Sequence, residues 1–229
     1  MPELRRTRHP APVTQTTALR IGTWNLEGRW TADHPAFMVG LDCDVWLATE
    51  VRRDTRLDGH QHHLTAGDMA PGRAWAGVLS RDSLTPLPDP HPASAMAIRG
   101  GTTYCSSVLP WRGSGGADPW VGADHASRTT HTVDSIRARL RRGAVWGGDF
   151  NHALSGPEYA GSLSGRAPIQ ELIDDLALVA PTAAEPHRIE GLLSIDHVTV
   201  PTTADVVGTE RHDASRLSDH DGYVVTAVH

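Results

Sequence analysis

The stretch that most constrains this chain runs from Ala144 to Asn151 and reads AVWGGDFN. An apolar run leads into two glycines, and Asp149 and Asn151 follow with only Phe150 between them. The pattern predicts a buried strand that runs out into a tight turn. In open α/β sheets, ligands bind outside the carboxyl ends of the strands, so both polar residues would lie where chemistry is usually done. Taken alone, however, the stretch favours a simple turn that Asp149 caps.

Two earlier segments also deliver a polar side chain at the end of a predicted strand. The segment 19–25 (LRIGTWN) ends on Asn25. The run 44–49 is nearly continuously apolar, which is typical of a strand covered on both faces, and it leads into Glu50. In isolation Asn25 would be explained as a turn residue and Glu50 as a surface charge. Their recurrence at strand ends favours a shared site.

Two later segments pair an aspartate with a histidine. LLSIDHVTVP predicts a strand with Asp196 and His197 in its middle, and Asp219 and His220 precede the last apolar strand. Successive residues of a strand point to opposite faces. If Asp196 faces the site, His197 is therefore better explained as a packing residue than as a catalyst.

The remaining pattern indicates an α/β protein. Helical spacing predicts helices over 35–41, 125–142 and 168–178, and the proline-rich segment 85–92 and the glycine-rich segment 111–124 are expected to be loops. Short strands joined by Gly and Pro turns are expected between the first and the second of these helices. Strands and helices in two comparable halves predict two sheets packed face to face, with helices outside.

Length and composition indicate one soluble unit. The chain has 229 residues, and we expect a disordered tail over 1–17 and a single domain over 18–229, acting as a monomer. The first residues lack the apolar core of a signal peptide, and no apolar run approaches the ~20 residues that span a membrane. Cys43 and Cys105 form no metal-type pair and fit buried thiols in a reducing compartment. We therefore expect a cytoplasmic protein.

Charge and motif content exclude several function classes. The formal net charge is −6, which argues against a basic surface that coats nucleic acid. All 21 basic residues are arginine. The chain therefore has no lysine for a Walker-type phosphate loop or for Schiff-base chemistry. It also has no G-x-S-x-G motif, so nothing supports a serine hydrolase.

Carboxylates gathered at one sheet edge would require a cation. Two unit charges 4 Å apart repel by roughly 1 kcal/mol in water and by about 4 kcal/mol at an effective dielectric constant of 20. Oxygen ligands without cysteine favour Mg²⁺ or Mn²⁺ over zinc, and Mg²⁺ commonly binds one or two carboxylates together with water and substrate phosphate. The pattern is typical of a metal-assisted phosphoesterase.

The order of LRIGTWN, DVWLATE, GGDFN, SIDHV and LSDHDG resembles the endonuclease/exonuclease/phosphatase superfamily, which has the DNase I-like fold. The resemblance extends from Leu19 to Val228. Each motif is weak alone, but the five in this order and spacing are specific. The resemblance implies a four-layer α/β sandwich of two mixed sheets packed face to face with helices outside, and a site at one edge of both sheets.

The resemblance also implies how the site would work. Glu50 would be the principal metal ligand, with Asn25 beside it and Asp219 contributing. Asp149 would orient or deprotonate the attacking water, and Asn151 would bind a phosphate oxygen in the transition state.

The histidine of the last motif completes the set that the resemblance implies. His220 would contact the scissile phosphate, and Asp196 would bond the other ring nitrogen and so fix its tautomer and charge. A general acid or base typically contributes about 10²- to 10⁴-fold to the rate, so the loss of His220 should be severe.

One segment departs from the pattern of the superfamily. Many of its nucleases carry a His or Tyr just before the proline that ends the middle strand, whereas this chain has Ser107 and Val108 there. Tyr104 lies too early in the strand. The source of a proton for the leaving group therefore stays open among water on the metal, Arg112 and His125.

The substrate also stays open. A nucleic-acid backbone is the leading candidate, with Arg52 and Arg112 as phosphate contacts and Trp111 as a stacking platform. A small phosphorylated metabolite or a lipid headgroup is the alternative within the enzyme class. A catalytically idle binding scaffold is the alternative from another class, and the clustered carboxylates argue against it.

Overall fold

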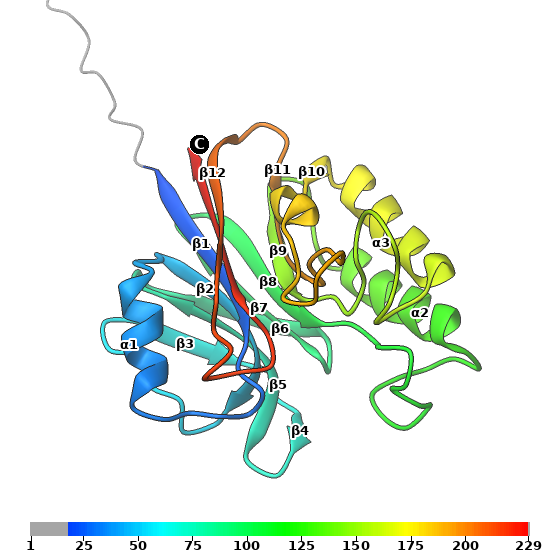
Figure 1. The fold of residues 1–229 in the computed structure, drawn as a ribbon, viewed down its shortest axis with the longest axis horizontal. Coiled ribbons are helices and arrows are strands. Elements are labelled where there is room, and N and C mark those ends of the chain that lie inside the picture. The colour runs from blue at the N-terminus through cyan, green and yellow to red at the C-terminus, as the bar shows by residue number, and fades with distance from the viewer. Residues whose placement is uncertain (1–17, 229) are drawn as a thin grey trace, which may run out of the picture.

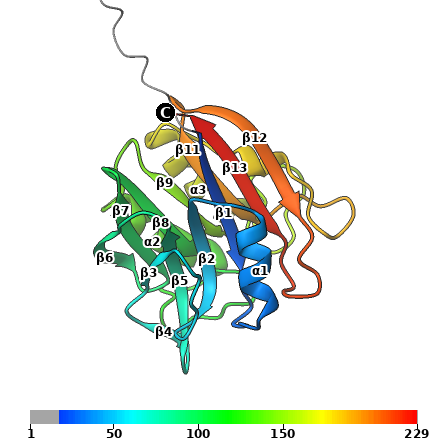
Figure 2. The ribbon, with the colours of Figure 1, turned by 90° about the vertical axis from the view of Figure 1, so that its left-hand side faces the viewer.

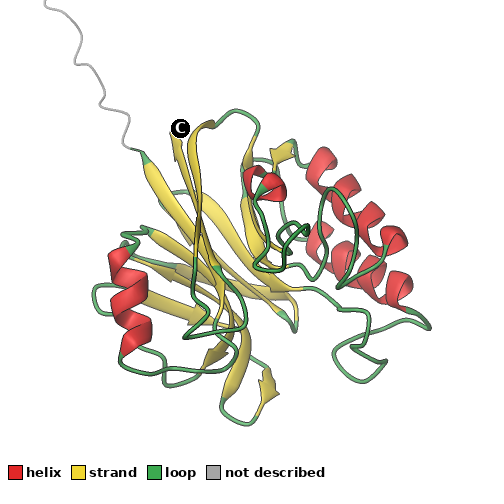
Figure 3. Ribbon diagram, in the orientation of Figure 1, coloured by secondary structure: helices red, strands yellow, loops and turns green. Residues whose placement is uncertain are grey.

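The computed structural model describes residues 18–228, and the tail expected over 1–17 lies outside the described residues. Two mixed β-sheets pack face to face, with α1 (Asp33–Gly40) on the outside of one sheet and α2 (His125–Arg137) and α3 (Leu163–Asp175) on the outside of the other (Figures 1 and 3). This is the expected four-layer α/β sandwich. No described helix is long and apolar enough to cross a membrane.

The first sheet has seven strands in the order β12-β13-β1-β2-β5-β3, with β4 paired to β5. In the side view, β12, β13, β1 and β2 run next to one another behind α1 (Figure 2). The pair β1 and β2 is parallel, and the other pairs are antiparallel. The strands are β1 (Leu19–Asn25), β2 (Val45–Arg52), β3 (Gln61–Leu64), β4 (Asp68–Ala70), β5 (Arg73–Ser80), β12 (Asp205–His212) and β13 (Gly222–Val228).

The second sheet has six strands in the order β10-β11-β9-β8-β7-β6. Here β8 and β9 form the parallel pair, with Val108 opposite Asp149 at its carboxyl end. A short 3₁₀ helix (Pro181–Ala184) precedes β11 in the chain. The strands are β6 (Thr85–His91), β7 (Ser94–Arg99), β8 (Thr102–Val108), β9 (Val145–Asp149), β10 (Leu178–Val179) and β11 (Asp196–Pro201).

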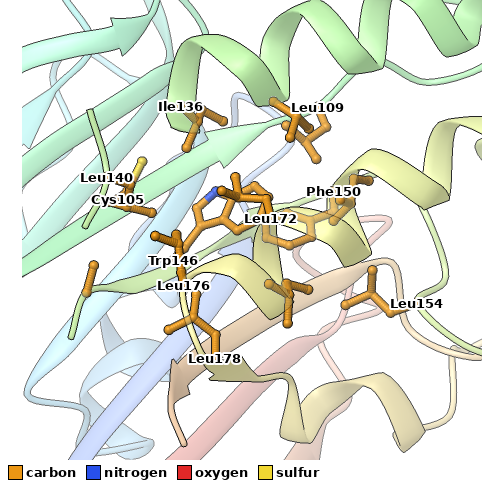
Figure 4. Packing of buried hydrophobic residues seen from close by; sticks show 14 of the residues in the cluster. Cys105, Leu109, Ile136, Leu140, Trp146, Phe150, Leu154, Leu172, Leu176 and Leu178 are labelled. Atoms are coloured by element: carbon orange, nitrogen blue, oxygen red, sulfur yellow. The ribbon is translucent and has the colours of Figure 1, made fainter. Parts of the chain in front are cut away.

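Side-chain alternation along the strands fills three apolar layers. On β9, Val145 points between the sheets and Trp146 points toward α2 and α3. Trp146 and Phe150 lie at the centre of the helix-side layer, with Leu172 of α3 beside them (Figure 4). On β2, Trp46 packs on the α1 side. All three layers consist of buried apolar side chains, which fixes the register of both sheets and hence the position of the strand ends.

The glycines of GGDFN are required by close packing. A Cβ at Gly147 would lie 2.4 Å from the His197 carbonyl oxygen, and a Cβ at Gly148 would lie 2.2 Å from the Ser107 carbonyl oxygen. Gly148 also has φ +122°, which other residues rarely adopt. These contacts bring β9 tightly between β8 and β11, so that Asp149 ends the strand at the centre of the sheet edge.

The expectation that the segment 85–92 is a loop is wrong, because residues 85–91 form β6. This strand pairs only with β7 at the edge of its sheet, and its register shifts between Leu87 and His91. Proline is tolerated on an edge strand, since its missing N–H would face solvent. The prolines therefore mark an edge rather than a loop.

Three boundaries also differ from the expected ones. The last helix begins at Leu163 rather than Pro168, because the Ser162 side chain accepts a hydrogen bond from Gly165 N–H and caps it. α2 ends at Arg137, where the next turns close on the Ile136 carbonyl. Strand β11 begins at Asp196, which was expected in its middle, because the Ser194 hydroxyl accepts from the Asp196 backbone N–H (3.0 Å) and donates to the Asp196 carbonyl (2.7 Å).

Candidate active site

The carboxyl ends of the two parallel strand pairs meet at one edge of the sandwich, and Asn25 joins them. Its Nδ2 donates to Glu50 Oε1 (3.2 Å) in its own sheet and to Asp149 Oδ2 (3.0 Å) in the other. Its Oδ1 accepts from Glu27 N–H (2.8 Å). The side chain of Arg73, at the start of β5, donates to Glu50 Oε2 (3.3 Å). One amide thus fixes two carboxylates that come from different sheets.

Two site residues have strained backbone. Glu50 and Asn151 both have φ 52°, in the left-handed region. Asn enters this region readily, but for Glu it costs of order 1–3 kcal/mol, which persists only where the surroundings require it. Glu50 interrupts the pairing of β2 with β5 between Thr49 and Val51, and this local distortion sets the direction of its side chain.

The His220 ring lies between three carboxylates. Its Nδ1 donates to Asp196 Oδ2 (2.7 Å), and its Nε2 lies 4.0 Å from Asp149 Oδ2 and 3.9 Å from Asp219 Oδ1. Nδ1 is therefore committed, while Nε2 faces the space between Asp149 and Asp219. A phosphate oxygen in that space would meet an N–H donor.

The loop that carries His220 is fixed to the strand ends. The Ser218 hydroxyl donates to the Asn25 carbonyl (2.7 Å) and accepts from His220 N–H (3.1 Å). Asp221, whose side chain is 1% exposed, pairs with Arg188 (2.7 Å) and with Arg211 (2.8 Å). Asp221 is thus an anchor of the loop, in contrast to Asp219.

Burial and charge shift the site pKa values in ways that suit proton chemistry. Burial raises the pKa of Asp149 to about 7, and Asp196 and Glu50 add to this rise, against the opposing effect of His220. Burial alone would lower the pKa of His220, but the carboxylates of Asp196 and Asp149 raise it to about 10. His220 is therefore a largely buried cation at neutral pH, with the Asp196 carboxylate on its Nδ1.

The donor set fits a hard divalent cation. Carboxylate oxygens of Glu50 and Asp149 lie on either side of the Asn25 side-chain NH2 group, and carboxylate oxygens are the ligands that such a cation prefers. Ligand atoms of Asp149, Asp196 and His220 also lie within 4.8 Å of one another. In that second group, Nδ1 of His220 is occupied by Asp196 and the raised pKa favours a proton on Nε2, so the Glu50 side is the better cation site.

Asn151 and Asp219 complete the predicted set at the rim. Asn151 Nδ2 donates to the Leu109 carbonyl (3.0 Å), and its backbone N–H donates to Asp149 Oδ1 (3.0 Å). The Asp219 side chain is 69% exposed, against 4% for Asp149. The structure thus brings Asn25, Glu50, Asp149, Asn151, Asp196, Asp219 and His220 to one edge, while their roles stay predictions.

The three predicted substrate contacts have intramolecular partners. Arg52 bonds Asp54 through two nitrogens (2.8 and 2.7 Å), and Arg112 bonds the Gly161 carbonyl through two nitrogens (2.9 and 2.7 Å). Trp111 packs edge-on against buried Trp120, with ring centroids 6.1 Å apart. None of these contacts joins them to the carboxylates at the sheet edge.

Sequence reasoning missed several residues of this edge. Arg73, Glu27 and Ser218 contact the predicted residues but come from strand starts and turns without a motif of their own. The Glu27 carboxylate accepts from Asp219 N–H (3.1 Å). Only Ser218 carried a signal, since it precedes the aspartate in the last motif.

The fold is that of the DNase I-like endonuclease/exonuclease/phosphatase structures, as the sequence motifs predicted. An AP endonuclease from Leishmania major aligns with a TM-score of 0.66 at 16% identity, over 100% of this chain and 93% of that chain. An endonuclease/exonuclease/phosphatase protein from Beutenbergia cavernae aligns with a TM-score of 0.63 at 19% identity, over 92% and 71%. A mannosyl-6-phosphatase from Bacteroides thetaiotaomicron gives 0.60 at 15%, over 92% and 100%. No family model and no curated protein matches the sequence.

Proposed function

We propose that this chain is a phosphoesterase that depends on Mg²⁺ or Mn²⁺ and hydrolyses phosphodiester bonds of nucleic acid. The observation that carries the proposal is the set of contacts that connects the two sheets at this edge. There the Asn25 amide connects Glu50 and Asp149, and the Asp196–His220 pair lies 4.0 Å from the same Asp149 oxygen. The aligned AP endonuclease and mannosyl-6-phosphatase both act on phosphate esters by name, which supports this class of reaction.

The residues divide the work between cation and phosphate. Glu50 and Asn25, with Asp219, would bind the cation, which when bound polarises the phosphate and offsets its negative charge. Asp149 orients the attacking water and accepts its proton, and its raised pKa of about 7 suits a base that works near neutral pH. This burial-driven shift would be reduced by a cation beside Glu50.

The imidazolium of His220 would donate from Nε2 to a phosphate oxygen, because Asp196 occupies Nδ1. Asn151 would donate the second hydrogen of its amide, since the first is bonded to Leu109. Both donors are fixed before substrate arrives, so they stabilise charge in the transition state without reorganisation.

A small phosphorylated substrate is the second candidate, and the state of the arginines favours it. Arg52, Arg53 and Arg73 pair with carboxylates of Asp54, Asp68 and Glu50. Paired arginines attract a polyanionic backbone less than free ones do, and the net charge of −6 acts in the same direction. The catalytic edge is the same for both substrates.

The test is hydrolysis of plasmid DNA, single-stranded DNA, RNA and bis(p-nitrophenyl) phosphate by the purified protein, each with Mg²⁺, Mn²⁺ or EDTA. Turnover of a polymer that EDTA abolishes is the expected result. Turnover of the aryl ester alone would move the assignment to a small substrate. No turnover with any metal would contradict the phosphoesterase, and calorimetry with Mg²⁺ would then test the idle scaffold.

A further inference from the structure

The end of β8 offers no phosphate donor. Ser107 and Val108 are buried, and the Ser107 hydroxyl accepts from Trp146 Nε1 (3.0 Å). The two side chains expected as substitutes are also engaged. His125 bonds the Ser162 hydroxyl (2.8 Å) and the Pro110 carbonyl (2.9 Å), and Arg112 bonds the Gly161 carbonyl. A protein donor at the phosphate, beyond His220 and Asn151, must come from another segment.

Tyr159 is the candidate for such a donor, because its loop follows Asn151 and its hydroxyl lies beside the segment that leads into Asp196. This half-buried side chain comes from the loop that follows Asn151, and its ring lies 5.1 Å from the His187 ring at an angle of 60°. Its hydroxyl is 3.4 Å from the Leu193 carbonyl, three residues before Asp196. A hydrogen bond of that length is weak, so the phenol O–H is available to a stronger acceptor.

The loop of Tyr159 is rigidly constructed. The Glu158 carboxylate accepts from the backbone N–H groups of Tyr159 (3.0 Å) and Gly161 (3.1 Å), and it pairs with Arg166 (3.2 Å). The Arg166 guanidinium also bonds the Gly156 carbonyl twice (3.0 Å each). The Glu158 side chain is 3% exposed. A buried ion pair that organises these three backbone groups fixes the position from which Tyr159 projects.

We propose that Tyr159 contacts the substrate and donates a hydrogen bond from its phenol to a non-bridging oxygen of the phosphate that is cleaved. The proposal rests on the phosphoesterase function above, and it assigns to the loop after Asn151 a contact that the end of β8 does not provide.

The electrostatic surroundings favour a hydrogen-bond donor over a proton donor. Burial raises the pKa of Tyr159, and the charges of Asp196 and Asp149 raise it further. A phenol that holds its proton this firmly donates a hydrogen bond at every working pH. It is a poor general acid, because an efficient acid has a pKa near the operating pH.

The first test compares Tyr159→Phe with Tyr223→Phe on the polymer and on a series of aryl phosphodiesters whose leaving groups differ in basicity. Tyr223 is a matched control, because its hydroxyl bonds the Pro186 carbonyl (3.1 Å) and its side chain is buried. Tyr159→Phe should lower kcat about 10- to 100-fold, by the same factor across the series, with KM little changed. Tyr223→Phe should retain wild-type kcat.

Two outcomes would overturn the proposal. Wild-type kcat in Tyr159→Phe would show that the phenol makes no such contact. A loss of kcat confined to basic leaving groups would show that Tyr159 is a proton donor instead. If wild-type protein and His220→Ala are equally inactive on every ester, the phosphoesterase itself fails. Calorimetric titration of the protein with inorganic phosphate in the presence of Mg²⁺ then tests the Tyr159 contact without turnover. Binding at least tenfold weaker in Tyr159→Phe than in Tyr223→Phe supports the contact, and equal or absent binding overturns it.

Discussion

His220 and His197 are both largely buried near Asp196, yet their surroundings impose opposite charges. The carboxylate of Asp196 lies 2.7 Å from His220 Nδ1, and the pKa of His220 rises to about 10. His197 Nε2 lies 2.9 Å from the His152 carbonyl, its Nδ1 lies 3.2 Å from the Thr182 hydroxyl, and burial lowers its pKa to about 4. Similar burial gives a cation on one side of β11 and a neutral ring on the other.

The difference separates the catalytic edge from buried histidines behind it, of which His152 and His197 are neutral at pH 7. The His152 and His125 rings stack 5.0 Å apart, and His152 bonds the Phe150 carbonyl (2.7 Å) through Nδ1. Burial lowers the pKa of His152 to about 4. These rings support the loop that follows Asn151, whereas His220 faces the site. A charged partner, and not burial, distinguishes a reactive histidine from a structural one.

The largest effect is expected for His220→Ala. The variant removes the only imidazolium at the described sheet edge, so kcat should fall by about 10³-fold, within the usual range for a general acid or base. His220→Gln can donate toward Asp196 but carries no charge, and it should lose nearly as much. The measurement is steady-state hydrolysis at saturating Mg²⁺, normalised to folded protein by circular dichroism. Activity within tenfold of wild type in either variant would contradict the role of His220.

His197→Ala should affect stability and leave the chemistry intact. The variant leaves the His152 carbonyl and the Thr182 hydroxyl without their ring partner and opens a cavity, which should lower the free energy of unfolding by about 2–4 kcal/mol. Urea unfolding measures the change, and kcat per folded molecule should stay within about threefold of wild type. A large loss of kcat in a folded variant would place His197 in the catalytic machinery.

The strand-end residues were the most predictable part of the site. Apolar runs that stop at Asn25 and Asp149 indicate both the strands and the edge at which they end, whereas β2 was expected to end on Glu50 and continues to Arg52. Side-chain alternation also separated His197 from Asp196, and the structure agrees, since His197 is buried behind the site. The local sequence pattern is enough to predict a site residue when its position depends only on where its own strand ends.

Contacts between distant segments were not predictable. Arg73 reaches Glu50 only because β5 pairs with β2, and the position of Tyr159 depends on the Glu158–Arg166 pair that organises its loop. Neither pairing has a local signature. The prolines of β6 were misinterpreted for the same reason, because a loop and an edge strand share the same local pattern.

Acid should destabilise the fold through three buried histidines whose pKa is lowered. Burial lowers the pKa of His91, His152 and His197 to about 4, from 6.5 in the unfolded chain. Between these values the unfolded state binds more protons, so this stability is fully present above pH 6.5 and is lost as the pH falls toward 4. Each group contributes up to roughly 3 kcal/mol. Urea unfolding from pH 7 to pH 4 measures the fall, which should be shallower in His197→Ala. An equally steep fall would exclude His197 as a source.

Asp219→Asn should have the smallest effect and so sharpen the contrast between buried and exposed groups at the edge. Its carboxylate is 69% exposed, and its backbone N–H, which the substitution keeps, anchors the loop to Glu27. An exposed carboxylate is solvated and screened, so its loss should cost about 1 kcal/mol or less, or up to about fivefold in the half-saturating Mg²⁺ concentration. Glu50→Gln, whose side chain is 19% exposed and lies against Asn25, should shift that concentration more than tenfold. Metal titrations of hydrolysis compare the two variants. A shift in Asp219→Asn as large as that in Glu50→Gln would mean that the cation is bound at the exposed side of His220.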